Sequence, residues 1–221
     1  RLLDIIGHWD KARPYFQKAL ELFDSTGFIH PRLYTEAQVR LGDLFIKNKD
    51  YSRALALLEK ARERSEESDD LYSLALCYLT LGIAHSKNGA DDKGIEMFEE
   101  AQGILNSMKP ERETHVLTAR ANNQLGFIST KLKDYDKALA HLEESVDLLR
   151  EYVNEDPLGE AFRLMGEVYC QRRQHIQSER ALKKANAIFE RMGARYECAR
   201  CSKSLGENYL AAGDLDMANF F

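Results

Sequence analysis

The sequence predicts an all-α protein in which antiparallel helix pairs follow one another as repeats. One observation behind this prediction is a pair of residues, Leu41-Gly42, that recurs at a nearly fixed period along the 221 residues. Another is the spacing of apolar residues, which return every three or four positions, as they do on one face of a helix. No segment of the sequence shows the strict alternation that is typical of a β-strand. A long fixed period of this kind indicates a repeat array.

The recurring pair sets the register of the repeats. Its glycines return at a nearly constant interval, of which the second is slightly longer, and small residues follow them at two fixed offsets. Packed helices approach to about 8–10 Å, depending on the side chains at the contact, so we expect these small residues where the two helices of a pair come closest. A large residue four positions after the first small one is expected to fill the neighbouring groove. The later pairs are Leu81-Gly82, Leu125-Gly126, Met165-Gly166 and Leu205-Gly206; the small residues are Ala54, Gly94, Ala138, Ser178 and Ala218, then Ala61, Ala101, Ser145 and Ala185; the large ones are Phe16, Leu58, Phe98, Leu142 and Leu182.

Composition and charge argue against several classes of function. The formal net charge is −5 and the sequence pI is about 5.8, so no overall positive field favours nucleic acid. No apolar run approaches the ~18 residues of a membrane-spanning helix, and no signal peptide is recognisable. The four cysteines lie in helical patterns, which predicts free thiols in a reducing, cytoplasmic setting. The sequence begins at Arg1 within a helix-like pattern, so we expect it to be part of a longer protein.

The first half of the chain contains clear helix signals. Residues 1–6 are expected to end one helix at Gly7, and Asp10 is expected to cap the next, which stops at Gly27. Pro31 then opens a helix whose partner is capped by Asp50. A third pair starts near Asp70 and turns at Asn88-Gly89.

The second half continues the same alternation. The longest helix is expected at about 111–132, after Lys109-Pro110, with the surplus of the longer interval between Asn106 and Ala119. Further helix starts and stops are expected at Asp134, Asp156-Pro157, Met192-Gly193 and Asp214, with a helix at about 194–212. The chain is therefore interpreted as one array: a half-repeat (1–27), full repeats at about 31–68, 70–107, 111–153 and 156–192, and a partial repeat (194–221).

These residues resemble the tetratricopeptide repeat family. The matching pattern is Leu41-Gly42-x-x-Phe45, then Tyr51-x-x-Ala54, then Leu58-x-x-Ala61, and it recurs around Leu125-Gly126. The resemblance implies a right-handed superhelical solenoid. The period near 40 differs from the usual 34 of the family and is similar to that of extended repeats in kinesin light chains, Leu-Gly-Asn scaffolds and bacterial regulators. The stretch from Phe189 to Gly206 is most similar to repeats attached to bacterial signalling ATPases and transcription regulators.

The resemblance also implies where a partner binds. In this family the first helix of each pair lines the concave face, through positions two, five, nine and twelve when the glycine is counted as position eight. Asn123 is predicted to hold a peptide backbone, since an amide both donates and accepts hydrogen bonds, and the arginines are predicted to hold carboxylates. The candidate ligand-binding residues are Asn123, Arg120, Phe127, Arg163, Leu79, Ile83, Glu167, Arg200 and Lys203.

A plainer interpretation applies to the same residues. Arginine and glutamate on helix faces are usually solvated or paired with each other, and such pairs contribute little. The lysine and asparagine clamp with which chaperone-binding members of the family hold a C-terminal carboxylate is absent in this register.

Other motifs give weaker signals. Cys198-x-x-Cys201 lacks the further ligands that a zinc site needs, so buried structural cysteines are predicted and no metal or cofactor is expected. His175 occupies an aromatic packing position. No nucleophile elbow or phosphate loop occurs. We therefore predict a non-enzymatic module that binds a protein or peptide segment, or a neighbouring domain, as a sensor or scaffold; self-association through the chain ends is a further expectation. The alternative is the non-catalytic region of an enzyme whose active domain lies elsewhere.

Overall fold

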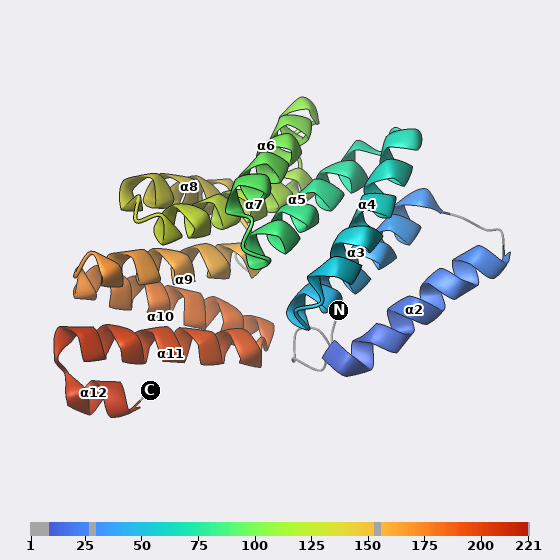
Figure 1. Cartoon of the computed structure of the whole chain (residues 1–221). Coiled ribbons are helices and arrows are strands. Elements are labelled where there is room, and N and C mark those ends of the chain that lie inside the picture. The colour runs from blue at the N-terminus through green and yellow to red at the C-terminus, as the bar shows by residue number, and fades with distance from the viewer. Residues whose placement is uncertain (1–8, 27–29, 153–155, 221) are drawn as a thin grey trace. The chain divides into compact units, whose positions relative to one another are not determined.

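The computed structural model describes residues 9–26, 30–152 and 156–220, and within these ranges the chain is helical with no strand (Figure 1). The all-α prediction is confirmed. The helices are α2 (Trp9–Thr26), α3 (Pro31–Lys47), α4 (Tyr51–Glu67), α5 (Leu71–Lys87), α6 (Asp91–Ser107), α7 (Arg112–Lys131), α8 (Tyr135–Leu148), α9 (Asp156–Gln171), α10 (His175–Met192), α11 (Arg195–Ala212) and α12 (Leu215–Phe220).

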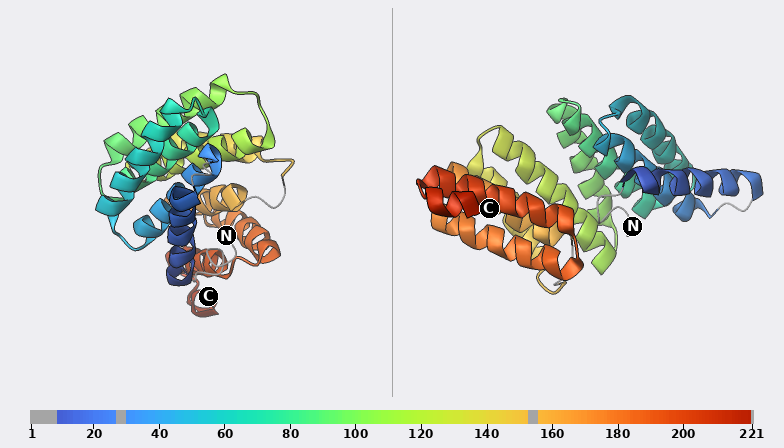
Figure 2. Two further views of the ribbon diagram at one scale, coloured as in Figure 1. Left: turned by 90° about the vertical axis from the view of Figure 1, so that its right-hand side faces the viewer. Right: turned by 90° about the horizontal axis from the view of Figure 1, so that it is seen from below.

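The helices form two compact units that divide within α7, between Ala121 and Asn122. The first unit contains α2 to α6 and the first part of α7, and the second contains the rest of α7 and α8 to α12. In each unit a helix packs against the next one along the chain. First helices of successive pairs also touch, α3 against α5 and α9 against α11, and Figure 2 gives two further views of the helix pairs. No helix in the described ranges is long and apolar enough to cross a membrane.

Glycine makes the close approach within each pair possible, as predicted. A Cβ atom on Gly82 would lie 2.5 Å from the ring of Phe98, and one on Gly166 would lie 2.5 Å from Leu182. Gly42 and Gly126 stand in the same relation to Leu58 and Leu142, at 2.9 and 2.8 Å. The four large side chains have no exposed surface. Each therefore occupies the space that a side chain on the glycine would need.

The turns inside the pairs share one backbone device. Seven positions after each glycine of the recurring pair, the chain adopts a left-handed conformation with φ between 59° and 86°. The following N–H closes the turn; that of Asp50, for example, donates to the carbonyl of Phe45 at 2.8 Å. This bond satisfies a carbonyl that the helix end leaves open. Only two of the five residues with this conformation are glycine, so the sequence predicts these turns only in part. The five residues are Lys49, Gly89, Lys133, Arg173 and Gly213.

The predicted caps are confirmed at Asp50, Asp134 and Asp214, and Asp70, near which the third pair was expected to start, caps its helix in the same way. Each carboxylate accepts the N–H three positions later at 3.0–3.3 Å. Asp10 differs, because α2 already begins at Trp9 and Asp10 lies inside its first turn. The predictions for residues 1–6, Gly7 and Gly27 lie outside the described residues.

The longest helix described is α7, as expected. α7 begins at Arg112 and α3 begins at Pro31. More residues lie between the start of α7 and its Gly126 than between the start of α3 and its Gly42. Most of the surplus in the repeat period therefore extends the start of α7, upstream of Ala119 as predicted.

Candidate functional site

The four predicted lining positions of the first helices differ in burial. Position five is closed in four successive repeats: Val39, Leu79, Asn123 and Arg163 expose 1, 0, 1 and 3% of their surface. On α11, the last first helix described, Lys203 occupies this position with 76% of its side chain exposed. Positions two and nine, by contrast, are mostly half-buried. Position five is therefore a packing column, and positions two and nine remain open to a ligand.

In the first unit the predicted apolar lining belongs largely to the interior. Leu79 packs against Ala101 and Ala121, and Ile83 is partly buried against the same cluster. On the neighbouring helix α3, Glu36 and Asp43 flank Arg40 at 3.9 and 4.0 Å. Leu79 thus has no surface to offer a ligand in this conformation, and Ile83 has only part of its side chain available.

Asn123 in the second unit is occupied by the protein itself. Its Nδ2 donates to the carbonyl of Pro157 at 2.8 Å and ties α7 to the start of α9. The amide does hold a backbone group, as its chemistry suggested, but that group belongs to this chain. Its Oδ1 is buried and has no hydrogen-bond partner among the described residues. Phe127, one helical turn further along, is half-buried against the cluster of Ala138 and Leu164.

Arg163 is the centre of a buried ionic network on α9 and α11. Only 4% of its side chain is exposed, and its guanidinium binds Glu160 at 2.7 Å and also binds Glu167. Ser204 on α11 donates to the same Glu167 carboxylate at 3.0 Å. Burial by itself would lower the pKa of Arg163, but the charges of Glu160 and Glu167 outweigh it and the pKa is raised. Arg163 therefore has its carboxylates already, and a ligand would have to displace them.

Arg200 extends this network towards the surface. It pairs with Glu197 at 2.8 Å and with Glu160 at 3.5 Å, and 38% of its side chain is exposed. Burial raises the pKa of Glu197, although the charge of Arg200 opposes that shift. Lys203 pairs with Glu207 at 3.1 Å on the exposed side of α11.

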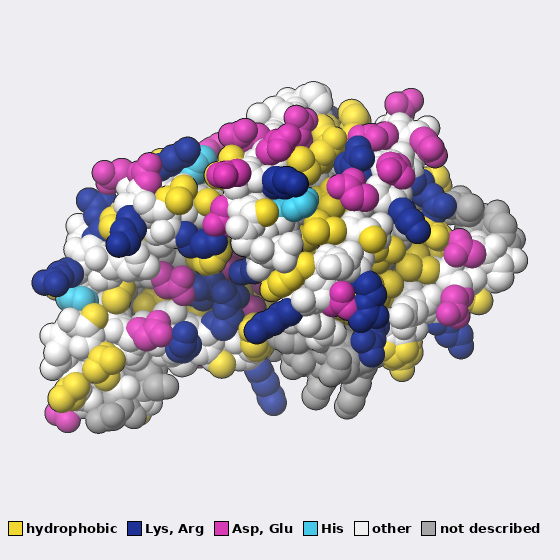
Figure 3. Space-filling model, in the orientation of Figure 1, with side chains coloured by type: hydrophobic (Ala, Val, Ile, Leu, Met, Phe, Trp, Pro, Cys, Tyr) yellow, Lys and Arg dark blue, Asp and Glu magenta, His cyan; other side chains and the backbone are white. Residues whose placement is uncertain are grey.

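Arg120 is the remaining predicted arginine, and it belongs to the first unit. It is half-buried and makes no ion pair with any residue in the described part of the chain. Of the predicted cations it is the least engaged. Charges of both signs are interspersed on the face shown in Figure 3, so no single-sign patch covers this view.

The cysteines are unpaired, and two of them lie deep in the helix packing. Burial raises the pKa of Cys77 and of Cys201 to about 12, which keeps both thiols protonated at neutral pH. In the ranges that the structure describes, no group of three His, Cys, Asp or Glu residues is arranged to hold a metal ion.

His175 and Asn208 form a second polar tie, between α10 and α11. The His175 Nδ1 lies 3.0 Å from the Asn208 Oδ1, and the Asn208 Nδ2 donates to the His175 carbonyl at 3.1 Å. His175 is therefore a packing residue with a hydrogen-bond partner. Sequence reasoning missed Asn208; its polar side chain in a mostly apolar helical stripe is the signal that marks it.

Comparisons with known proteins agree with this architecture. The sequence model of the tetratricopeptide repeat matches residues 34–107 and 117–190. BtubC from P. vanneervenii is similar in structure, with a TM-score of 0.72 at 20% identity over 96% of this chain and 87% of that chain. PlcR from Bacillus thuringiensis, solved in complex with the peptide PapR7 and DNA, gives 0.73 at 17% identity over 90% and 70%.

A third similar structure is a signal transduction ATPase with numerous domains from Pyrococcus horikoshii, which has a tetratricopeptide repeat sensor. Its TM-score is 0.68 at 16% identity, over 98% of this chain and 34% of that chain. At these identities the likeness shows the fold, while the sequence match covers more than half of the chain. The chain belongs to the tetratricopeptide repeat family.

Proposed function

We propose that this chain is a non-enzymatic, cytoplasmic module that binds a protein or peptide segment through positions two and nine of its first helices. One observation supports this most strongly. The buried Arg163 holds Glu160 and Glu167, whose side chains are 22 and 31% exposed. These carboxylates are thus fixed in direction while remaining accessible. A polar surface that is rigid before binding loses less entropy when a partner arrives.

The chemistry of this face suits an extended peptide. Glu160 and Glu167 accept hydrogen bonds from backbone or side-chain donors, and Arg200 donates to carbonyl or carboxylate oxygens. In the same unit Phe127 adds a half-buried apolar side chain. In the first unit, Arg120 and Ile83 are the residues with free surface among those predicted.

Within this proposal, the chain is a sensor or regulatory region of a larger signalling protein. The repeats of the Pyrococcus horikoshii ATPase are described as a sensor, and PlcR was solved with a peptide and DNA. This chain spans about a third of that ATPase and 87% of BtubC. A free-standing scaffold is the second candidate, and the non-catalytic region of an enzyme is the third.

A peptide-array screen tests the proposal. The wild type is compared with an Arg200→Ala, Lys203→Ala variant of α11 and with an Arg120→Ala variant of α7. Asn123 and Arg163 are unsuitable, because substitutions at these buried residues would disturb packing. The matched control is Arg180→Ala, Lys183→Ala, which removes two exposed cations from the second helix α10.

Loss of captured peptides with the α11 or α7 variant, together with normal capture by the α10 control, supports binding at the first helices. Unchanged capture with both test variants would overturn the proposed face. Thermal unfolding of each variant must show an unchanged midpoint, since these side chains are exposed or half-exposed and are expected to contribute little to stability.

A further inference from the structure

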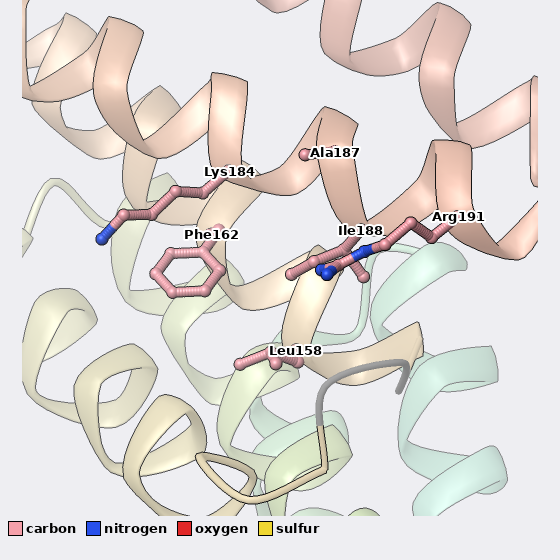
Figure 4. A pocket seen from close by; sticks show the side chains of 6 residues that line it. All are labelled: Leu158, Phe162, Lys184, Ala187, Ile188 and Arg191. Carbon is pink, nitrogen blue, oxygen red and sulfur yellow. The ribbon is translucent and has the colours of Figure 1, made fainter.

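A pocket of about 250 Å³ lies between α9 and α10 (Figure 4). Leu158 and Phe162 line it from α9 at i and i+4, so they share one helix face. Lys184, Ala187, Ile188 and Arg191 line it from α10 at i, i+3, i+4 and i+7, which again is a single face. The lining is therefore a continuous apolar floor with a cation towards each end.

This pocket is separate from the ionic network of the same helix. Successive residues on a helix are about 100° apart around its axis. Leu158 and Phe162 therefore lie on a different side of α9 from Glu160 and Arg163. None of the pocket residues takes part in the hydrogen bonds of Arg163, Arg200 or Ser204. The pocket thus belongs to a different surface from the proposed peptide-binding face.

Both pocket cations lack an acidic partner among the described residues. Lys184 lies with its ammonium 5.1 Å from the centre of the Phe162 ring, and Arg191 makes no ion pair with a described residue. The neighbouring Lys183, by contrast, binds Glu179 at 2.5 Å. Lys184 and Arg191 are exposed, whereas Leu158 and Ile188 are buried, so the charged groups surround an apolar floor.

The size and charge of the pocket restrict its occupant. Pockets for drug-sized ligands have volumes of roughly 300–1,000 Å³, so this one has room for about one or two side chains. Its two cations come from positions seven apart on α10, and a rise of 1.5 Å per residue separates their backbones by roughly 10 Å. A carboxylate on each side of the apolar floor can therefore pair with the nearer cation. Two acidic residues four apart on an extended peptide point to the same face as the residue midway between them and lie roughly 13 Å apart, within reach of these two long cationic side chains.

We infer that the α9–α10 pocket is a second binding site, for an extended peptide segment in which an apolar residue has one acidic residue two positions before it and another two positions after it. The apolar side chain packs on the floor formed by Leu158, Phe162 and Ile188. The flanking carboxylates pair with Lys184 and Arg191. Ion pairs at exposed positions are individually weak, so the apolar contact provides most of the affinity and the charges provide the selectivity.

Fluorescence anisotropy with short, end-blocked, labelled peptides tests this inference. The probe is Gly-Glu-Ser-Phe-Ser-Glu-Gly, and the comparison peptides are Gly-Gln-Ser-Phe-Ser-Gln-Gly and Gly-Glu-Ser-Ser-Ser-Glu-Gly. We expect saturable binding of the probe and at least about tenfold weaker binding of each comparison peptide. A tenfold change in affinity corresponds to a loss of about 1.4 kcal/mol of binding free energy. Octanoate is the competitor that represents a ligand with a single carboxylate.

Three variants place the binding. Lys184→Glu with Arg191→Glu reverses the flanking charges, and Ala187→Trp fills the floor from an exposed position. Both are expected to weaken probe binding at least tenfold. The matched control, Arg180→Glu with Lys183→Glu, reverses two cations elsewhere on α10 and should leave it unchanged, as should Arg200→Ala with Lys203→Ala on α11. Circular dichroism checks that each variant is folded.

The inference is overturned if the wild type gives no saturable signal or binds the glutamine peptide equally well. It is also overturned if Ala187→Trp binds the probe normally, or if octanoate displaces the probe as effectively as the unlabelled peptide does, because one carboxylate would then suffice. The proposal that a peptide binds at the first helices fails on a different result, which is unchanged peptide capture on the array by the α11 and α7 variants. That result would not change the anisotropy measurements.

Discussion

Leu79 in the first unit and Arg163 in the second occupy the same position of their repeats, and both are buried. Leu79 is surrounded by apolar side chains, so its contact with the neighbouring repeat depends on apolar burial. Arg163 binds Glu160 and Glu167 on its own helix, and these partly exposed carboxylates in turn contact Arg200 and Ser204 of the next repeat. The comparison shows that one scaffold position tolerates either solution. It also shows a consequence: in the second unit, the residues that stabilise the repeat contact are the ones that form the polar face.

The largest effects are expected from removing these two side chains. Leu79→Ala should lower the free energy of unfolding by about 2–5 kcal/mol through lost burial and a cavity. Arg163→Ala should lower it by about 3–5 kcal/mol, because two carboxylates lose their shared partner. Urea denaturation followed by circular dichroism measures both.

A matched set of variants sharpens that difference. Adding Glu160→Gln and Glu167→Gln to Arg163→Ala should recover part of the lost stability, because the uncompensated charges are removed. The same two substitutions should recover nothing when added to Leu79→Ala. If the two glutamine substitutions change the free energy of unfolding equally in the Arg163→Ala and Leu79→Ala proteins, the Arg163 contact is not electrostatic.

A smaller and equal effect is expected where the two units share the same geometry. A side chain on Gly82 or Gly166 meets Phe98 or Leu182 at 2.5 Å, so Gly82→Val and Gly166→Val should each cost about 1–3 kcal/mol through overpacking. Gly103→Val is the control, since nothing lies within 4 Å of its added Cβ. If the control costs as much as the test variants, the glycines are not needed for close helix approach.

Loss of a helix cap should cost about 1 kcal/mol in either unit. Asp70→Ala removes the acceptor of the Ser73 N–H in the first unit, and Asp134→Ala removes that of the Lys137 N–H in the second. Thermal unfolding of the two variants measures the cost, with Asp70→Asn and Asp134→Asn expected to retain most of the stability. If only one of the two alanine variants is destabilised, the prediction that each cap stabilises its own helix is wrong.

The smallest effect is a pH dependence that the ionic region of the second unit should show. Burial raises the pKa of Glu197 in the folded state, so its folded form holds a proton more strongly than its unfolded form. Stability is therefore lost as the pH rises from the unfolded value of about 4.3 through the higher folded value. Glu197→Gln should flatten this part of the curve of unfolding free energy against pH. A variant curve that runs parallel to the wild type would refute the raised pKa.

Much of the fold was predictable because its signals are local. Apolar spacing, the caps Asp50 and Asp134, and the recurring glycines each report on one helix or one pair. The left-handed turn residues Lys49, Lys133 and Arg173 carried no such signal, since lysine and arginine usually avoid that conformation. Their positions become clear only from the turns that the helix pairs impose.

The candidate site was less predictable. Asn123 and Arg163 were recognised as unusual polar residues, but nothing in the sequence distinguishes a ligand from the protein itself as their partner. In the structure the partners are the Pro157 carbonyl and two glutamates of α9.

The repeat period, the helix pairs, their caps and the glycines that let each pair close all follow from the sequence alone. These features depend on spacing along the chain, and they repeat because the same local geometry repeats. Which first-helix positions stay open is settled by tertiary packing, since burial at position five depends on how near the next repeat lies. That distance is set by groups in the following repeat, such as the Pro157 carbonyl that binds Asn123 and the Ser204 hydroxyl that binds Glu167.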